Sequence, residues 1–319
     1  MRGAVILNPS KIIDLDGQRE AIAGALADAG CPEPLWFETT VEDPGCGQAR
    51  AAVEQGADVV IACGGDGTVR ACAQALAGTD VPLAILPTGT GNLLVTNLDL
   101  PADVPGVVAL ATSGARRCID LGELDGLPFT VMAGMGFDAA MMEATPETWK
   151  RWFGWPAYVA GGLRRLRDRP MTLTVSLDGG PPKRHRARSV LIANVGQLQG
   201  GIELFTDARP DDGILDVALV CPRTLGQWAA LAYAVLRRRR PARRHLKTFR
   251  AKTVEIRSTE PEPRELDGET IEPGTHLTVT VRPAALWLCA PEPQSADASV
   301  VPTSSKRATT GSPISRGRD

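Results

Sequence analysis

Residues 1–120 alternate between short, uninterrupted hydrophobic runs and stretches in which hydrophobic residues recur at helical spacing. Uninterrupted runs closed by Gly, Pro or Asn predict strands that are buried on both faces. Strands that alternate with helices predict a parallel sheet within an α/β domain. The predicted strands are Gly3–Leu7, Leu35–Phe37, Asp58–Cys63 and Val81–Leu86, and the predicted helices are 18–29, 48–55 and 69–77.

The second half of the chain shows short alternating runs separated by turn clusters such as Asp178–Pro182 and Asp211–Gly213. This pattern predicts an antiparallel β-rich domain, built as a β-sandwich, that begins near residue 122. Helical stretches at 147–168 and 223–240 interrupt it. The predicted strands are 172–178, 189–195, 214–220, 253–257, 277–282 and 286–289.

The length of 319 residues agrees with about two domains, and the 43% hydrophobic content excludes a wholly disordered chain. We expect an α/β domain over 1–121 and a β-sandwich domain over 122–289. From 290 to 319 the sequence is rich in Pro, Ser, Ala and Thr, which predicts a disordered tail.

Seven cysteines without a Cys-x-x-Cys pair indicate buried, reduced thiols, and they argue against a disulfide framework or a zinc ribbon. The hydrophobic run before Asn8 is too short for a signal peptide, and no run approaches the length of a membrane span. The net charge of −2 excludes polyanion binding over the whole surface, so any basic patch is local. We expect a soluble, cytoplasmic protein that can still touch a membrane surface.

The segment Gly64–Thr68 (GGDGT), between a predicted strand and a predicted helix, is the most informative stretch. Glycines let the backbone approach a ligand closely, and a helix N-terminus favours an anion. An Asp at the centre of such a loop repels phosphate unless a cation or a hydroxyl intervenes, so Asp66 points to metal-assisted phosphate chemistry. The alternative is a plain turn in which Asp66 caps the helix.

Two further polar strand ends belong to the same edge of the predicted sheet. The segment Pro87–Asn92 follows the next strand, and Asn8-Pro9 follows the first. Ligands of α/β proteins bind in crevices at the carboxyl edge of parallel strands. Three such strand ends at one edge indicate a ligand site more readily than three unrelated turns.

Together these motifs resemble the diacylglycerol kinase catalytic-domain family, which includes bacterial diacylglycerol and YegS-like lipid kinases and is related to sphingosine and ceramide kinases. The likeness extends over about residues 3–289. The segments that carry it are Asn8-Pro9, Gly64–Thr68, Gly89–Asn92, Gly134–Asp138, Pro210–Asp216 and Leu266–Glu269.

The resemblance implies an ATP-dependent kinase in which domain 1–121 binds the nucleotide, domain 122–289 binds the lipid, and Mg²⁺ is required. Glu269 then corresponds to the general base, with Asp267 beside it. A structural Mg²⁺ corresponds to the Asp212 carboxylate with main-chain oxygens near Arg209 and Ile214. A threonine after the second strand also contacts nucleotide in bacterial members; Thr39 and Thr40 compete for this role, and Thr40 is favoured. The other implied nucleotide contacts are Asn8, Pro9, Gly64, Gly65, Asp66, Gly67, Thr68, Gly89, Thr90 and Asn92.

The chain departs from the family pattern at two points. Arg70-Ala71 stands where many members have Asn-Glu, and Leu93 stands where an Asp is frequent. These changes alter the details of nucleotide and metal contact, but they leave the loops in place. For Leu266–Glu269 and for Asp211–Gly213, ordinary turns with solvated acids are the alternative reading.

Between 223 and 252 there are ten basic residues and no acidic residue. Nine of the ten follow the apolar stretch Leu225–Leu236. An apolar helix with a polybasic end suits an anionic membrane surface. The alternative is a buried helix followed by solvated arginines. For the aromatic stretch 141–158, ordinary core is the alternative to a lipid-facing wall. Nucleic acid is not expected, because no array of stacking aromatics accompanies the arginines. A homodimer is left open.

The leading hypothesis is therefore a cytoplasmic, peripherally membrane-associated lipid kinase that phosphorylates a lipid hydroxyl, with diacylglycerol as the default acceptor. An NAD kinase-like phosphotransferase is the first alternative, because it shares the GGDG loop. A catalytically silent lipid- or nucleotide-binding module is the second, and the presence of Asp66 and Glu269 argues against it.

Overall fold

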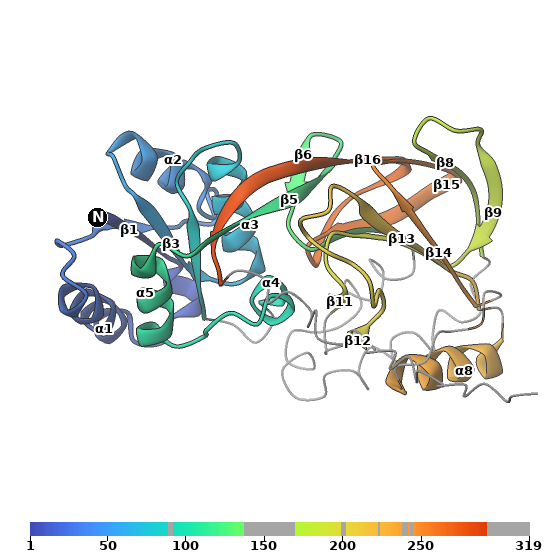
Figure 1. The fold of residues 1–319 in the computed structure, drawn as a ribbon. Coiled ribbons are helices and arrows are strands. Elements are labelled where there is room, and N and C mark those ends of the chain that lie inside the picture. Colours follow the sequence, from blue (N-terminus) through green and yellow to red (C-terminus); the bar gives the residue numbers. More distant parts are fainter. Residues whose placement is uncertain are drawn as a thin grey trace, which may run out of the picture.

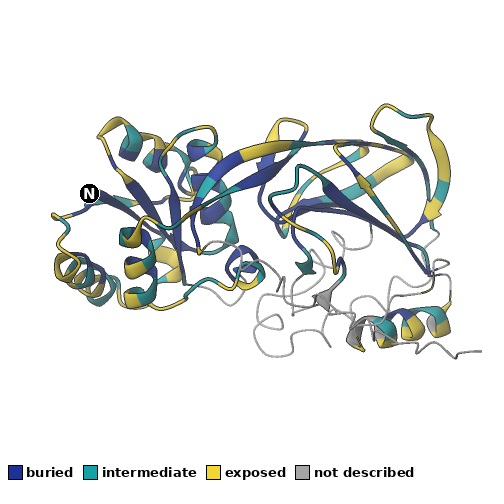
Figure 2. Cartoon of the chain, in the orientation of Figure 1, coloured by how far each residue is buried: buried dark blue, intermediate teal, exposed yellow. Residues whose placement is uncertain are grey.

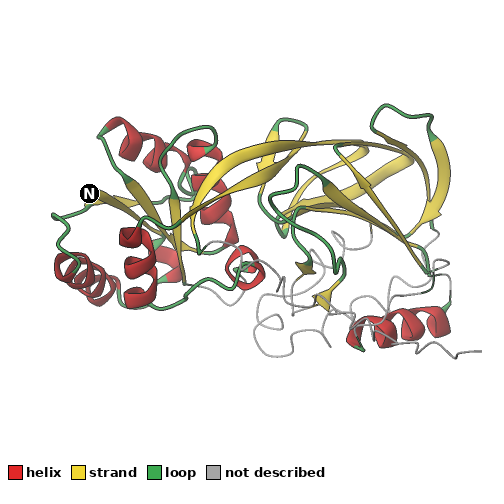
Figure 3. Ribbon diagram, viewed as in Figure 1, coloured by secondary structure: helices red, strands yellow, loops and turns green. Residues whose placement is uncertain are grey.

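The computed structural model has an α/β domain and a β-sandwich domain, as predicted, and one continuous sheet runs through both (Figures 1 and 3). The structure describes residues 1–88, 92–136, 170–198, 202–222, 224–237, 242 and 245–291. The predicted helix 147–168, the aromatic stretch 141–158 and all but the first two residues of the predicted tail lie outside these ranges.

The α/β domain is a parallel sheet with helices on both faces. Alternate residues of each strand point to opposite faces: Ala4 and Ile6 share a core with α2 and α3, whereas Val5 and Leu7 share one with α1 and α5. The strands, in spatial order, are β2 (Leu35–Glu38), β1 (Gly3–Leu7), β3 (Val59–Gly64) and β4 (Leu83–Pro87). The helices are α1 (Leu15–Asp28), α2 (Cys46–Glu54), α3 (Asp66–Leu76), α4 (Leu93–Asn97) and α5 (Val104–Ser113), with a 3₁₀ turn at Pro9–Lys11.

The second domain is antiparallel, and its inner faces form a separate hydrophobic core (Figure 2). Helix α8 (Leu225–Leu236) packs through Leu231 and Trp228 onto hydrophobic residues outside that core, while Tyr233 is exposed. The strands are β5 (Arg116–Leu124), β6 (Leu127–Phe129), β7 (Met132–Gly136), β8 (Met171–Leu177), β9 (Lys183–Ala187), β10 (Ser189–Ala193), β11 (Gln197–Leu198), β12 (Ile202–Glu203), β13 (Leu215–Val220), β14 (Leu246–Ala251), β15 (Thr253–Leu266) and β16 (Glu269–Cys289).

Strand β16 joins the two domains (Figure 1). It leaves the sandwich antiparallel to β15 and β5, and its end lies parallel to β4, with Leu288 opposite Leu83. The sequence predicted two strands, 277–282 and 286–289, but they are one strand with a register shift between Arg282 and Leu286, around Pro283. The expected domain boundary after residue 121 falls within β5.

Three helices of the α/β domain differ from the sequence prediction. Helix α3 begins at Asp66, three residues earlier than expected, so the GGDGT loop includes its first turn. Helices α4 and α5 were not predicted; in α5, Pro105 lies in the first turn, where Pro is well tolerated. The described residues contain no helix long and apolar enough to cross a bilayer.

Candidate active site

The carboxyl edge of the parallel sheet brings together residues from three of the motifs. Asn8 Nδ2 donates to Thr68 Oγ1 (3.1 Å), and Asn92 Nδ2 donates to the Gly64 carbonyl (3.1 Å). A Cβ atom on Gly64 would lie 2.6 Å from the Thr68 side chain, so this position requires glycine. The ends of β1 and β3 and the segment after β4 therefore form one connected rim, as the sequence predicted.

Asp66 links the first turn of α3 to the segment after β4. Its Oδ1 accepts the N–H of Leu93 at 2.9 Å. The cap position of α3 is Gly65, which argues against the reading of Asp66 as a simple helix cap. Burial raises the pKa of the Asp66 carboxyl to about 6, the Leu93 N–H opposes this rise, and the negative charges of Asp267 and Glu269 add to it.

Two buried polar atoms on the same rim have no hydrogen-bond partner in the described part of the chain. They are Thr88 Oγ1, directly after β4, and Asn92 Oδ1. Buried polar groups normally have partners, so atoms left without one next to a loop edge are suited to a ligand. Of the predicted contacts in this segment, Gly89 and Thr90 lie outside the described residues.

The contacts of Thr39 and Thr40, the two threonines after β2, do not single out either one as a ligand contact. The Thr40 hydroxyl accepts the N–H of Asp43 (3.1 Å) and so closes a turn before α2, whereas Thr39 is buried. Pro9 begins the 3₁₀ turn that Asn8 caps through Ser10. These observations leave the roles of Thr39, Thr40 and Pro9 as predictions.

The Leu266–Glu269 segment forms a two-residue hairpin turn between β15 and β16. Asp267 and Gly268 have φ values of 46° and 83°, as a type I′ turn requires. The Asp267 carboxylate is buried and accepts four hydrogen bonds: from the N–H groups of Thr130 (2.8 Å), Val131 (2.8 Å) and Met132 (2.9 Å), and from the Thr130 hydroxyl (3.0 Å). Four donors occupy the lone pairs of a carboxylate, so Asp267 anchors the turn and has little capacity left for a ligand.

Glu269 projects from this turn toward the other domain. A Cβ atom on Gly67, in the first turn of α3, would lie 2.5 Å from Glu269 Oε1, so the carboxylate sits directly over that glycine. Its second oxygen, Oε2, contacts Arg70 Nη2. The side chain of Glu269 remains 55% exposed, which leaves it accessible to a substrate. The structure thus places the predicted base beside the predicted phosphate loop.

The turn predicted to hold Mg²⁺, Asp211–Gly213, differs from the Glu269 turn in what surrounds its acids. Asp212 Oδ1 accepts the N–H of Ile214 (3.1 Å), and Oδ2 contacts Arg250 Nη2. The described residues contain no group of three His, Cys, Asp or Glu side chains that could surround an ion. Mg²⁺ requires oxygen ligands with free lone pairs directed at it. Each Asp212 oxygen has one donor partner, which leaves lone pairs on both, so the assignment of Asp212 and the main-chain oxygens of Arg209 and Ile214 to Mg²⁺ stays a prediction.

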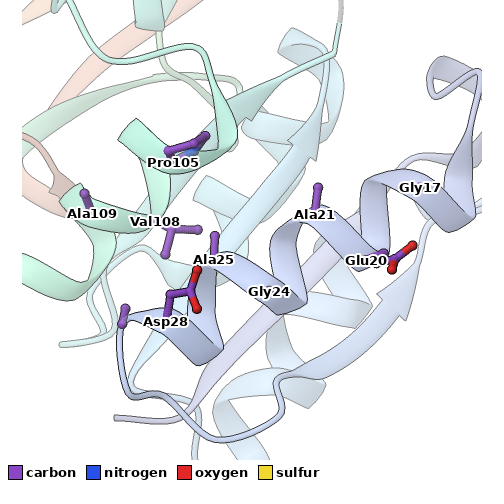
Figure 4. A pocket seen from close by; sticks show the side chains of 10 residues that line it. Gly17, Glu20, Ala21, Gly24, Ala25, Asp28, Pro105, Val108 and Ala109 are labelled. Carbon is purple, nitrogen blue, oxygen red and sulfur yellow. The ribbon is translucent and has the colours of Figure 1, made fainter.

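A groove between α1 and α5 lies away from these residues, on the outer face of the α/β domain (Figure 4). Its lining combines small residues, including Gly24 and Ala109, with the acids Glu20 and Asp28. Acidic side chains disfavour a nucleotide phosphate, and no predicted site residue contributes to the lining. This groove is not the candidate active site.

Two residues that organise the site region were not predicted from the sequence. Arg70 was noted only as a departure from the family pattern, although it follows Asp66 by four residues and so shares its helix face. Asp120 is buried in β5, where it accepts the N–H groups of Gly213 (2.6 Å) and Ala284 (2.8 Å). A lone Asp in a predicted strand gives no local signal of such long-range contacts.

Comparison with known proteins agrees with the two-domain fold. A family model described as the diacylglycerol kinase catalytic domain matches residues 5–124, and one described as the YegS C-terminal NAD kinase beta sandwich-like domain matches residues 131–290. A crystal structure of a diacylglycerol kinase from Bacillus anthracis has a TM-score of 0.71 at 21% identity, over 91% of this chain and 97% of that one.

Two curated proteins are similar in sequence over most of their length. The chain is 32% identical over 287 residues to a "Probable lipid kinase YegS-like" of Pseudomonas aeruginosa, covering 85% of this chain and 89% of that protein. It is 31% identical over 217 residues to a diacylglycerol kinase of Mycobacterium tuberculosis, covering 65% and 69%. The chain therefore belongs to the diacylglycerol kinase catalytic domain family of lipid kinases, with a C-terminal domain of the YegS type.

Proposed function

We propose that the protein transfers the γ-phosphoryl group of ATP to the hydroxyl group of a lipid, with diacylglycerol as the acceptor and phosphatidic acid as the product. The position of Glu269 over Gly67 is the observation that carries this proposal. Phosphoryl transfer to a hydroxyl requires a carboxylate that can accept the hydroxyl proton and positive groups around the phosphate. The β15–β16 turn supplies the carboxylate, and the N-terminus of α3 supplies positive dipoles beside it.

The rim formed by Asn8, Thr68 and Asn92 is suited to the phosphates of ATP, and the free polar atoms of Thr88 and Asn92 point to the same use. ATP would bind as its Mg²⁺ complex, and the ion would neutralise charge on the phosphoryl oxygens. Asp66 fits this cation, because burial raises the pKa of its carboxyl to about 6 and the charges of Asp267 and Glu269 add to the rise. A positive charge at this point would offset that repulsion.

In the proposed reaction the lipid hydroxyl lies between Glu269 and the γ-phosphorus. Its oxygen forms the new P–O bond, Glu269 takes the proton, and the bond to the β-phosphate oxygen breaks to release ADP. The exposed position of Glu269 leaves room for the acceptor to approach from the side of the sandwich.

For the substrate to be reached, we propose that the protein docks at the cytoplasmic surface of an anionic membrane. Of the basic cluster between 223 and 252, the described cations include Arg237, Lys247, Arg250 and Lys252. Arg237 lies over the exposed Tyr233 ring, 5.6 Å from its centroid, at the end of α8. Exposed aromatic and cationic side chains at one helix end are suited to the interface of a bilayer.

The direct test offers labelled ATP and Mg²⁺ to the full chain with diacylglycerol, ceramide, sphingosine or NAD, the lipids presented in mixed anionic micelles. We expect label in diacylglycerol. Label in another lipid would identify that lipid as the acceptor in place of diacylglycerol. Label in NAD would overturn the proposed function in favour of the NAD kinase alternative. Absence of transfer to every acceptor, with ATP binding retained, would favour the silent binding module.

A further inference from the structure

Arg70 connects the two halves of the candidate active site. It extends from α3 to the β15–β16 turn, where Nη1 donates to the Leu266 carbonyl (3.0 Å) and Nη2 contacts Glu269 Oε2. One guanidinium therefore holds the residues immediately before and immediately after Asp267-Gly268. The Arg70 side chain is 18% exposed, against 55% for Glu269, so the arginine is the more firmly held partner of the two.

These contacts fix the direction of the Glu269 carboxylate. Arg70 engages Oε2, while Oε1 lies over Gly67 in the first turn of α3. The planar fork of a guanidinium fixes the orientation of its acceptors, which a flexible ammonium group does not. The turn itself cannot rotate, because the four hydrogen bonds to Asp267 hold it from the other side.

Arg70 also supplies positive charge where three acids meet. Asp267 and Glu269 both raise the pKa of Asp66, and Arg70 lowers the pKa of Asp267, although burial has the larger, opposite effect there. A guanidinium in contact with a carboxylate favours its ionised form. The cation of Arg70 therefore offsets part of the repulsion among these carboxylates.

We propose that Arg70 is the positioning residue for Glu269: its guanidinium holds Oε2 and so aims Oε1 at the acceptor hydroxyl. This inference rests on the proposed function, since it assigns Glu269 the role of the base. Among the described residues, the hydrogen bonds and the ion pair of the Arg70 side chain all go to this turn, so we infer that it acts through Glu269 and not on the substrate.

The test compares Arg70→Met, Arg70→Lys and Arg282→Met with the unchanged protein, measuring kcat and the KM for ATP separately. Arg282 is the matched control, because it also pairs with a glutamate between two elements (Glu123, 3.7 Å) but lies outside the site. We expect Arg70→Met to lower kcat about 100-fold, within the range lost with a general base, and to leave the KM for ATP nearly unchanged.

Arg70→Lys keeps the charge but loses the fork, so we expect it to restore only part of the lost kcat. Arg282→Met should match the unchanged protein. Three outcomes would overturn the proposal: a kcat for Arg70→Met within twofold of the unchanged protein, full activity of Arg70→Lys, which would assign the effect to charge and not to direction, or a raised KM for ATP at constant kcat. The last would assign Arg70 to nucleotide binding.

A second measurement separates this proposal from the proposed function. Urea unfolding of Arg70→Met, Glu269→Gln and the double variant forms a cycle that requires no substrate. Non-additive shifts of the unfolding midpoint support the link between the two side chains even if no tested lipid is phosphorylated. Additive shifts would overturn it, whatever the activity assays show.

Discussion

The two acidic glycine turns of the sandwich domain look alike in sequence but have different surroundings. In Leu266–Glu269 one acid, Asp267, is buried against four donors, and the other, Glu269, reaches the α/β domain. In Asp211–Gly213 both acids are already paired, Asp211 with Arg117 (2.7 Å) and Asp212 with Arg250. Glu269 is paired as well, with Arg70, but its Oε1 lies over Gly67 and its side chain is 55% exposed, against 15% for Asp211 and 21% for Asp212. Which acid stays accessible for chemistry therefore depends on distant residues.

Neutralising one acid in each turn tests most directly whether the two turns differ in function. We expect Glu269→Gln to reduce kcat by 10²- to 10⁴-fold, because a general base contributes an effect of this size. ATP binding, measured by calorimetry, should change little, since Asn8, Thr68 and Asn92 are untouched. The matched variant Asp212→Asn should retain nearly full activity. Equal losses in the two variants would remove the distinction between the turns.

Within the first turn, the two acids should separate stability from activity. Asp267→Ala removes the acceptor of three backbone N–H groups that would remain buried, and each such group costs about 1–3 kcal/mol. We therefore expect a loss of about 3–5 kcal/mol in the free energy of unfolding, read by urea denaturation. Glu269→Gln should lose less than 1 kcal/mol, because that side chain is half-exposed. A similar stability for both variants would contradict the anchoring role of Asp267.

The pH dependence of stability tests the cluster of acids at the phosphate loop. The pKa of Asp66 is raised from 3.8 to about 6, so the folded protein binds this proton more tightly than the unfolded chain does. Stability linked to Asp66 is therefore present at low pH and declines as the pH rises from about 4 to 6. Asp66→Asn should raise the free energy of unfolding at pH 8 by about 1–3 kcal/mol, and the gain should shrink toward pH 4. An equal gain in the free energy of unfolding at both pH values would show that the titration of Asp66 is not its cause.

The sequence was sufficient for the architecture and for the rim of the α/β domain, because both depend on local patterns. Buried hydrophobic runs identified β1, β3 and β4, and the polar residues after them identified the edge at which Asn8, Gly64 and Asn92 meet. The sequence was insufficient where the outcome depends on long-range pairing. Arg70 meets Glu269 across 199 positions, and Arg250 meets Asp212 across 38, and neither contact has a local signature.

The smallest expected effect concerns the cation at the second turn. Arg250 already contacts Asp212 and lies 3.6 Å from Asp216, so added Mg²⁺ should have little to bind there. We expect EDTA to leave the thermal midpoint of the ATP-free protein unchanged. Arg250→Met should destabilise it by no more than about 1 kcal/mol, because the arginine is 44% exposed and solvent screens the pair.

The decisive comparison is the response to Mg²⁺ of the unchanged protein and of the Arg250→Met variant. If Arg250 supplies the positive charge of this turn, the variant leaves Asp212 and Asp216 without a counter-charge. Mg²⁺ should then raise the thermal midpoint of the variant, although it does not raise that of the unchanged protein. Burial already raises the pKa of Asp216 to about 6, and the charge of Arg250 opposes that rise, so removing the arginine adds to the demand for a cation. A midpoint of the unchanged protein that falls on adding EDTA would show instead that Mg²⁺ binds this turn despite Arg250. The second turn would then depend on a cation from outside the chain, whereas Arg70 supplies the cation of the first.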